Sequence, residues 1–156
     1  MSLTWSIQTP ESGPAIARAS GRVTEGVNFA EVIALAEAGP LALHLTEVSQ
    51  ISSTGVREWI LFMRALSEKP HPVELLEVSP TLVRQLNMIA NFGGAATIRS
   101  VVLPYYCDAC GNEQIQILEL EGASSADIAA EQPCEACGET AEFDDIAQNY
   151  LSFASR

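Results

Sequence analysis

The sequence predicts an α/β protein in which helices pack on a mixed β-sheet, followed by a small cysteine-rich insertion. Along residues 1–103, short apolar or alternating runs take turns with segments whose apolar residues recur at helical spacing. Of the 156 residues, 47% are hydrophobic and 18% are charged, which suits a folded core and excludes a disordered tail. Two Cys-x-x-Cys-Gly motifs follow in the remaining third.

The first elements are two strands and a helix. Residues 4–8 and 15–19 alternate between apolar and polar side chains, with a turn rich in Pro and Gly between them. Asn28 is an expected N-cap, and Glu31 follows three residues later as in a capping box. Apolar residues at helical spacing then continue to Gly39, where a Gly-Pro pair ends the helix.

Three further strands are expected at residues 41–45, 73–78 and 97–103. A helix begins at Gly55, and a second begins with Ser79 as N-cap before a proline at the first helical position. The predicted order β-β-α-β-α-β-α-β favours a mixed sheet with right-handed crossovers. In the first of these helices, helical spacing places three large side chains in the core rather than in an exposed patch: Trp59, Phe62 and Met63.

Beyond Pro104 the composition changes. Residues 114–120 predict a strand, and residues 122–132 a polar, Ala-rich connector. A final helix is expected over residues 142–154, since it carries four apolar residues at helical spacing: Phe143, Ile146, Tyr150 and Phe153. Those side chains need a surface, so the helix should pack back on the first sheet. The expected division is therefore 1–103, a ribbon at 104–140, and a terminal helix at 141–156.

The two cysteine motifs are the strongest chemical signal. They contain Cys107 and Cys110, then Cys134 and Cys137, separated by 23 residues. Four thiolates at such spacing predict a tetrahedral Zn²⁺ site, although the gap slightly exceeds the usual zinc-ribbon range. Because four protein ligands leave no open position, the zinc would be structural.

The cysteine pattern also fits three other interpretations. A rubredoxin-like iron centre uses the same paired motifs, and Tyr105 and Tyr106 precede the first of them, but no further aromatics surround the second. A redox dithiol normally stands alone at a helix start. Structural disulfides need an oxidising compartment, which nothing in the sequence indicates. A zinc site with four cysteine ligands is the favoured interpretation.

The charge is strongly asymmetric. The formal net charge is −12; residues 1–103 hold 9 acidic and 7 basic residues, whereas residues 104–156 hold 11 acidic residues and only Arg156. Binding to a phosphate backbone needs a basic stripe, so no nucleic-acid partner is expected. Residues 1–6 do not resemble a secretory signal, and no apolar run reaches the roughly 18–20 residues that span a bilayer. A cytoplasmic protein without a membrane span is expected.

Three segments together resemble a STAS domain, the module of anti-anti-sigma factors and of the cytosolic tails of sulphate transporters. Residues 15–23 resemble its opening strand and Gly-x-Val turn, residues 44–55 its central strand and helix start, and residues 73–80 its fourth strand. The resemblance covers about residues 3–103 and the terminal helix. It implies a STAS-like mixed β-sheet with helices packed on it, interrupted by a small zinc-ribbon insertion.

The resemblance implies a non-enzymatic bacterial regulatory module. Ser53 matches the family's phosphorylated serine, and an anti-sigma factor or a related serine kinase is the implied partner. Phosphate there would meet free backbone N–H groups at the helix start. The partner-binding surface would comprise these residues: Ser52, Ser53, Thr54, Gly55 and Arg57.

This sequence departs from the family at two positions, because His44 and Ser52 stand where the family has aspartates. Two alternatives therefore stay open: Ser52–Thr54 only cap the helix, and the protein is an unphosphorylated scaffold subunit of a larger assembly. The paired cysteine motifs leave a further alternative, an iron-containing electron carrier. Neither the partner's identity nor the oligomeric state follows from the sequence.

Overall fold

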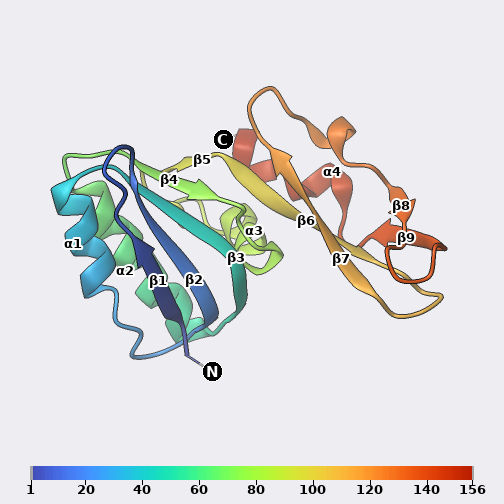
Figure 1. Ribbon diagram of the computed structural model, residues 1–156, viewed down its shortest axis with the longest axis horizontal. Helices are drawn as coiled ribbons and strands as arrows, with labels where there is room; N and C mark the ends of the chain where they lie inside the picture. Colours follow the sequence, from blue (N-terminus) through green and yellow to red (C-terminus); the bar gives the residue numbers. More distant parts are fainter. Residues whose placement is uncertain (1, 156) are drawn as a thin grey trace.

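The computed structural model describes residues 2–155, which form two β-sheets joined by one continuous chain (Figure 1). The first sheet has the order β1-β2-β3-β4-β5, in which β1 runs antiparallel to β2 and the other neighbours are parallel. Its strands are β1 (Thr4–Gln8), β2 (Ala15–Val23), β3 (Leu41–Ile51), β4 (Val73–Leu76) and β5 (Thr97–Ile98). The predicted α/β class and mixed sheet are confirmed, and the observed element order through β5 is the expected one.

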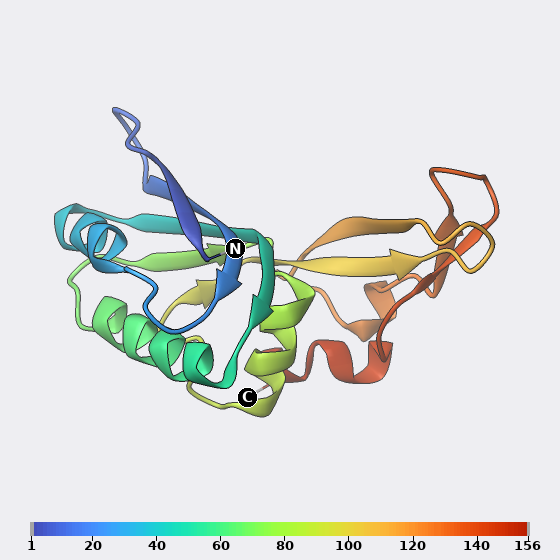
Figure 2. The ribbon, with the colours of Figure 1, turned by 90° about the horizontal axis from the view of Figure 1, so that it is seen from below.

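Helices cover one face of the first sheet (Figure 2). They are α1 (Ala30–Ala38), α2 (Ser53–Ser67) and α3 (Pro80–Met88). The core beneath them contains an aromatic cluster, in which the rings of Phe29 and Phe62 stack at 4.2 Å. Trp59, Phe62 and Met63 are each at most 2% exposed, so their predicted place in the core is confirmed.

Two helix starts differ in detail from the prediction, and one of them is α2, which begins at Ser53 rather than at Gly55. The capping box between Asn28 and Glu31 does not form: α1 begins at Ala30, and Phe29 stands at the N-cap without a side-chain hydrogen bond. The Oδ1 atom of Asn28 instead accepts a hydrogen bond from the N–H of Ala30 at 3.0 Å. The shift leaves the Phe29 ring free to pack in the aromatic cluster. Ser79 does stand at the N-cap of α3, before Pro80.

The expected strand at residues 97–103 is two strands in different sheets. After β5 the backbone of Arg99 is bonded on both sides: its N–H donates to Leu75, and its carbonyl accepts from Leu120. The chain then enters β6 (Ser100–Tyr106), which pairs antiparallel with β7 (Glu113–Glu119). The second sheet therefore begins at Ser100 rather than at Pro104.

The second sheet is antiparallel, with the order β7-β6-β9-β8. Its remaining strands are β8 (Glu131–Pro133) and β9 (Thr140–Phe143), and the connector before β8 contains the short helix η1 (Ser125–Asp127). An isolated parallel bridge between Val78 and Val101 links the region after β4 to this sheet.

The expected helix over residues 142–154 is wrong. Residues up to Phe143 belong to β9, and the helical part consists of α4 (Ala147–Tyr150) and η2 (Ser152–Ser155). The apolar residues do not share one face, because Phe143 pairs with Tyr105 of β6 while Ile146 is 59% exposed. Strand pairing next to the cysteine motif thus overrides the helical spacing.

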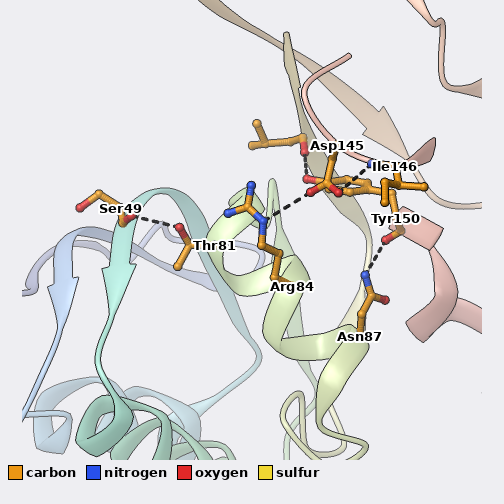
Figure 3. Close-up of polar contacts among 8 residues, drawn as sticks. Ser49, Thr81, Arg84, Asn87, Asp145, Ile146 and Tyr150 are labelled. Carbon is orange, nitrogen blue, oxygen red and sulfur yellow. Dashed lines mark hydrogen bonds and ion pairs between the residues drawn. The ribbon is translucent and has the colours of Figure 1, made fainter. Parts of the chain in front are cut away.

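The terminal segment nevertheless lies on α3 (Figure 3). The Nδ2 atom of Asn87 donates to the carbonyl of Tyr150 at 3.1 Å, and its Oδ1 accepts from the N–H of Phe153 at 2.8 Å. Arg84 forms an ion pair with Asp145 at 3.4 Å. These contacts fix the chain after β9 against the first part of the protein. None of the helices within residues 2–155 combines the length and the apolar character needed to cross a membrane.

Candidate functional site

The two cysteine motifs adopt the same backbone turn. The N–H of Gly111 donates to the carbonyl of Cys107 at 2.7 Å, and the N–H of Gly138 donates to that of Cys134 at 2.9 Å. Both glycines have positive φ, 77° and 81°, a conformation that other residues rarely adopt. The repeated Cys-x-x-Cys-Gly pattern therefore encodes two equivalent turns.

Each turn joins the two strands of a hairpin, and strand pairing brings the hairpins together. The first motif lies between β6 and β7, and the second between β8 and β9. The strands β6 and β9 pair at Tyr105–Phe143 and Tyr106–Glu142, directly before the first motif and after the second. Cysteines 24 or more residues apart thus meet at one end of the second sheet.

The four thiols form a compact cluster. The Sγ atoms of Cys107 and Cys137 are 3.6 Å apart, as are those of Cys110 and Cys134, and all four lie within 4.8 Å of one another. A regular tetrahedron with Zn–S bonds of about 2.3 Å has sulfur–sulfur edges of about 3.8 Å. All four residues are free thiols, so the cluster could hold a metal ion.

The cluster is half enclosed. Cys107 and Cys134 are buried, whereas Cys110 and Cys137 are exposed. The backbone N–H groups of Cys137 and Ala136 lower the pKa of the Cys134 thiol to about 6. A thiolate is the form that binds a metal, so these donors favour the ligand state of Cys134 at neutral pH. Burial and the neighbouring thiols instead raise the pKa of Cys137 to about 12.

Gln114 ties the two motifs together, and sequence analysis missed it. Its side chain is only 7% exposed. Its Oε1 accepts from the N–H of Glu135 at 2.9 Å and from the Nδ2 of Asn112 at 3.1 Å, while its Nε2 donates to the carbonyl of Pro133 at 3.0 Å. One amide thus bridges residues beside both pairs of cysteines.

The residues around Ser53 lie far from the cluster in the chain, at the start of α2. Ser52 is the N-cap, and its Oγ accepts from the N–H of Gly55 at 3.0 Å. Ser53 is the first helical residue and is exposed, as are Thr54 and Arg57. Capping is therefore performed by Ser52, and no hydrogen bond of the Ser53 hydroxyl occurs within the described chain.

Gly55, in contrast, is not a surface residue. It is buried, and a Cβ atom at this position would lie 2.0 Å from the carbonyl oxygen of Val23. Its lack of a side chain lets α2 approach β2, so Gly55 positions the exposed residues at the start of α2.

His44 does not join Ser53. It lies inside β3, in register with Arg18 of β2 and Leu76 of β4. Ile51, the last residue of β3, lies seven positions further along the strand, a distance of about 23 Å. Burial and the charge of Arg18 lower its pKa, which favours a neutral side chain. The surface beside Ser52 has a hollow of about 400 Å³, which Arg22 lines and His44 does not.

The chain matches no protein-family model and no curated protein.

Proposed function

We propose that the protein is a non-enzymatic regulatory module that binds a protein partner through the exposed start of α2, with a structural Zn²⁺ in its ribbon. The proposal for α2 is carried by one observation: Ser52 caps the helix, so the exposed Ser53 hydroxyl is left available. The resemblance of residues 15–23, 44–55 and 73–80 to STAS domains supports the same site.

Phosphorylation of Ser53 would change this surface strongly. Transfer of the γ-phosphoryl group of ATP to the serine oxygen releases ADP and a proton, and adds about −1.5 to −2 charges at neutral pH. The first turn of a helix has unpaired N–H groups and a positive dipole end, which favour an anion. Arg22, in the wall of the adjoining hollow, adds a positive side chain nearby. The partner would be an anti-sigma factor or a related serine kinase.

The zinc proposal rests on the sulfur geometry. Two of the sulfur separations, at 3.6 Å, are close to the edge of a Zn–thiolate tetrahedron, and all four sulfurs lie within 4.8 Å of one another. Four such ligands would complete the coordination shell of the ion. A metal held in this way stabilises the surrounding segment rather than performing catalysis. The second sheet is small and carries most of the net negative charge, so cross-linking its two hairpins by a cation favours folding.

Reversible cross-linking in extract of the native cell, followed by mass spectrometry, tests which protein binds and whether its binding depends on Ser53. Wild type, Ser53→Ala and Ser53→Asp are compared, and Ser12→Asp is the matched control. Ser12 is exposed and lies in the turn before β2, at the opposite end of the parallel strands. We expect an ATPase of the serine-kinase type to bind wild type, Ser53→Ala and Ser12→Asp, and to be lost with Ser53→Asp.

Reconstitution with purified proteins tests whether Ser53 is phosphorylated. The captured ATPase, purified and supplied with ATP, should phosphorylate wild type at Ser53 and leave Ser53→Ala unmodified at that position. Equal capture by all four proteins would overturn the switch and make the protein an unphosphorylated scaffold subunit. A red colour in the purified protein would contradict zinc and favour the iron-containing electron carrier.

A further inference from the structure

Strand β7 presents an open edge. It stands first in the order β7-β6-β9-β8 and pairs only with β6 within the described residues (Figure 2). All seven residues from Glu113 to Glu119 are in register with β6. An edge strand of this length offers a row of backbone donors and acceptors to any extended chain that lies beside it.

The register shows which backbone groups are available. In antiparallel pairs, residues bonded to the partner alternate with residues whose N–H and C=O groups point away. Leu120 donates to Arg99 and Cys107 donates to Asn112, so the bonded positions of β7 are the even-numbered ones. The outward-pointing groups therefore belong to four residues: Glu113, Ile115, Ile117 and Glu119.

The same four residues are exposed, and their side chains form a defined pattern. Ile115 and Ile117 are 47% and 40% exposed, which is unusual for isoleucine, and Tyr106 beside Glu113 is 38% exposed. Glu113 and Glu119 stand at the two ends. The edge thus reads acidic, apolar, apolar, acidic at alternate positions.

A second copy of the chain does not fit this edge. Two antiparallel β7 strands with full overlap would place Glu113 opposite Glu119 at both ends. Like charges directly opposite each other are destabilising in a sheet. The surrounding residues 104–156 carry 11 acidic residues and one basic residue, so two copies would also repel at longer range.

We propose that β7 binds an extended segment of a partner protein that adds a strand to the second sheet, with basic residues at its ends and two apolar residues between them. The pattern basic-x-apolar-x-apolar-x-basic pairs both glutamates and covers both isoleucines in either strand direction. Main-chain hydrogen bonds supply affinity, and the alternate side chains supply specificity. This surface is separate from the start of α2 and does not require modification of Ser53.

Fluorescence anisotropy with synthetic peptides tests the proposal. The probe is a labelled Lys-Thr-Val-Thr-Ile-Thr-Lys peptide, and the comparison peptide has glutamates in place of both lysines. We expect saturable binding of the basic peptide and binding of the acidic peptide weaker by roughly tenfold or more. Raising the salt concentration should reduce that difference.

Three variants locate the binding to β7. Ile117→Pro removes an N–H group that points away from β6 and keeps the hydrogen bonds to β6. It should lower the affinity for the basic peptide by roughly tenfold. The double variant Glu113→Lys/Glu119→Lys should reverse the peptide preference. The control Glu131→Lys/Glu142→Lys changes the net charge equally on exposed positions of β8 and β9, and should keep the preference. Thermal melting verifies that each variant is folded.

Each remaining result contradicts the proposal. An affinity weaker than about 1 mM for the basic peptide would overturn it. So would an equal change of preference in the control double variant, since that would indicate general charge attraction. Sedimentation that shows a dimer abolished by Ile117→Pro would assign β7 to a second copy of the chain instead.

Discussion

The side-chain carbonyl of Gln114 accepts a hydrogen bond from the N–H of Glu135 at 2.9 Å, across the gap between the two cysteine motifs. Because the same side chain also contacts Asn112 and Pro133, it holds one hairpin turn against the other. The positions of the thiols therefore depend on a residue that binds no metal itself.

Gln114→Ala is expected to weaken metal binding by about 10- to 100-fold, as losses of outer-sphere support commonly do. Gln116→Ala is the matched control, because Gln116 lies on the same strand but is exposed. Competition with a chromophoric chelator measures both affinities. Equal affinities in the two variants would show that Gln114 does not position the thiols.

Tyr150→Phe should destabilise the protein by about 1–2 kcal/mol. The hydroxyl of Tyr150 donates to the carbonyl of Val102 at 2.5 Å, and this carbonyl points away from β7, so the variant leaves a buried acceptor without its partner. Urea unfolding measures the change, with the exposed Tyr106→Phe as control. A loss no larger than that of Tyr106→Phe would contradict this role.

Tyr150 also predicts a pH dependence. Burial raises the pKa of Tyr150 above its ordinary value, so the folded state favours the protonated phenol. The resulting stability is complete below about pH 10 and is lost as the pH rises further. Wild type should therefore lose more stability than Tyr150→Phe above about pH 10. Parallel curves for the two proteins would refute the assignment.

Asn87→Ala should loosen the terminal segment from α3. Both amide atoms of Asn87 bond this segment, at the carbonyl of Tyr150 and the N–H of Phe153. Hydrogen exchange should accelerate over residues 147–155, with a stability loss of about 1–3 kcal/mol. Asn91→Ala, at an exposed position after α3, is the control. Unchanged exchange in Asn87→Ala would contradict the role of Asn87 in holding the terminal segment on α3.

Gly55→Ala should disturb the start of α2. The added Cβ would lie 2.0 Å from the carbonyl oxygen of Val23, so the helix or β2 must move. Overpacking of this kind costs about 1–3 kcal/mol. Gly39→Ala, where nothing lies within 4 Å and the backbone is extended, should have little effect. The two melting temperatures test the contrast, and equal values would contradict it.

The sequence predicted the order of elements in the first sheet because several helix boundaries carry local signals. The strand ends were predicted less well, since β2 and β3 extend to Val23 and Ile51, beyond the expected residues 15–19 and 41–45. Gly39 ends α1 before a proline, and Ser79 with Pro80 begins α3. The cysteine motifs are equally local, since each glycine defines its own turn. Such features follow from backbone conformation and need no knowledge of distant contacts.

The second sheet was harder because its elements depend on distant partners. Arg99 separates β5 from β6 through backbone hydrogen bonds to Leu75 and Leu120. An arginine at this position does not indicate that the chain passes from one sheet to the other. Phe143 fits helical spacing, yet its partner Tyr105 makes it a strand residue. Gln114 and Gln116 are identical in type and two positions apart, so only the fold reveals which one supports the cysteines.

The most direct test of the metal centre is the metal content of the purified protein, combined with the absorption spectrum of its cobalt(II) form. We expect one zinc ion per chain and a cobalt spectrum typical of four thiolates in tetrahedral geometry. Cys107→Ser should weaken binding of both ions and alter that spectrum. Protein that is purified under reducing conditions without metal and fails to bind zinc or cobalt would contradict the four-thiolate centre.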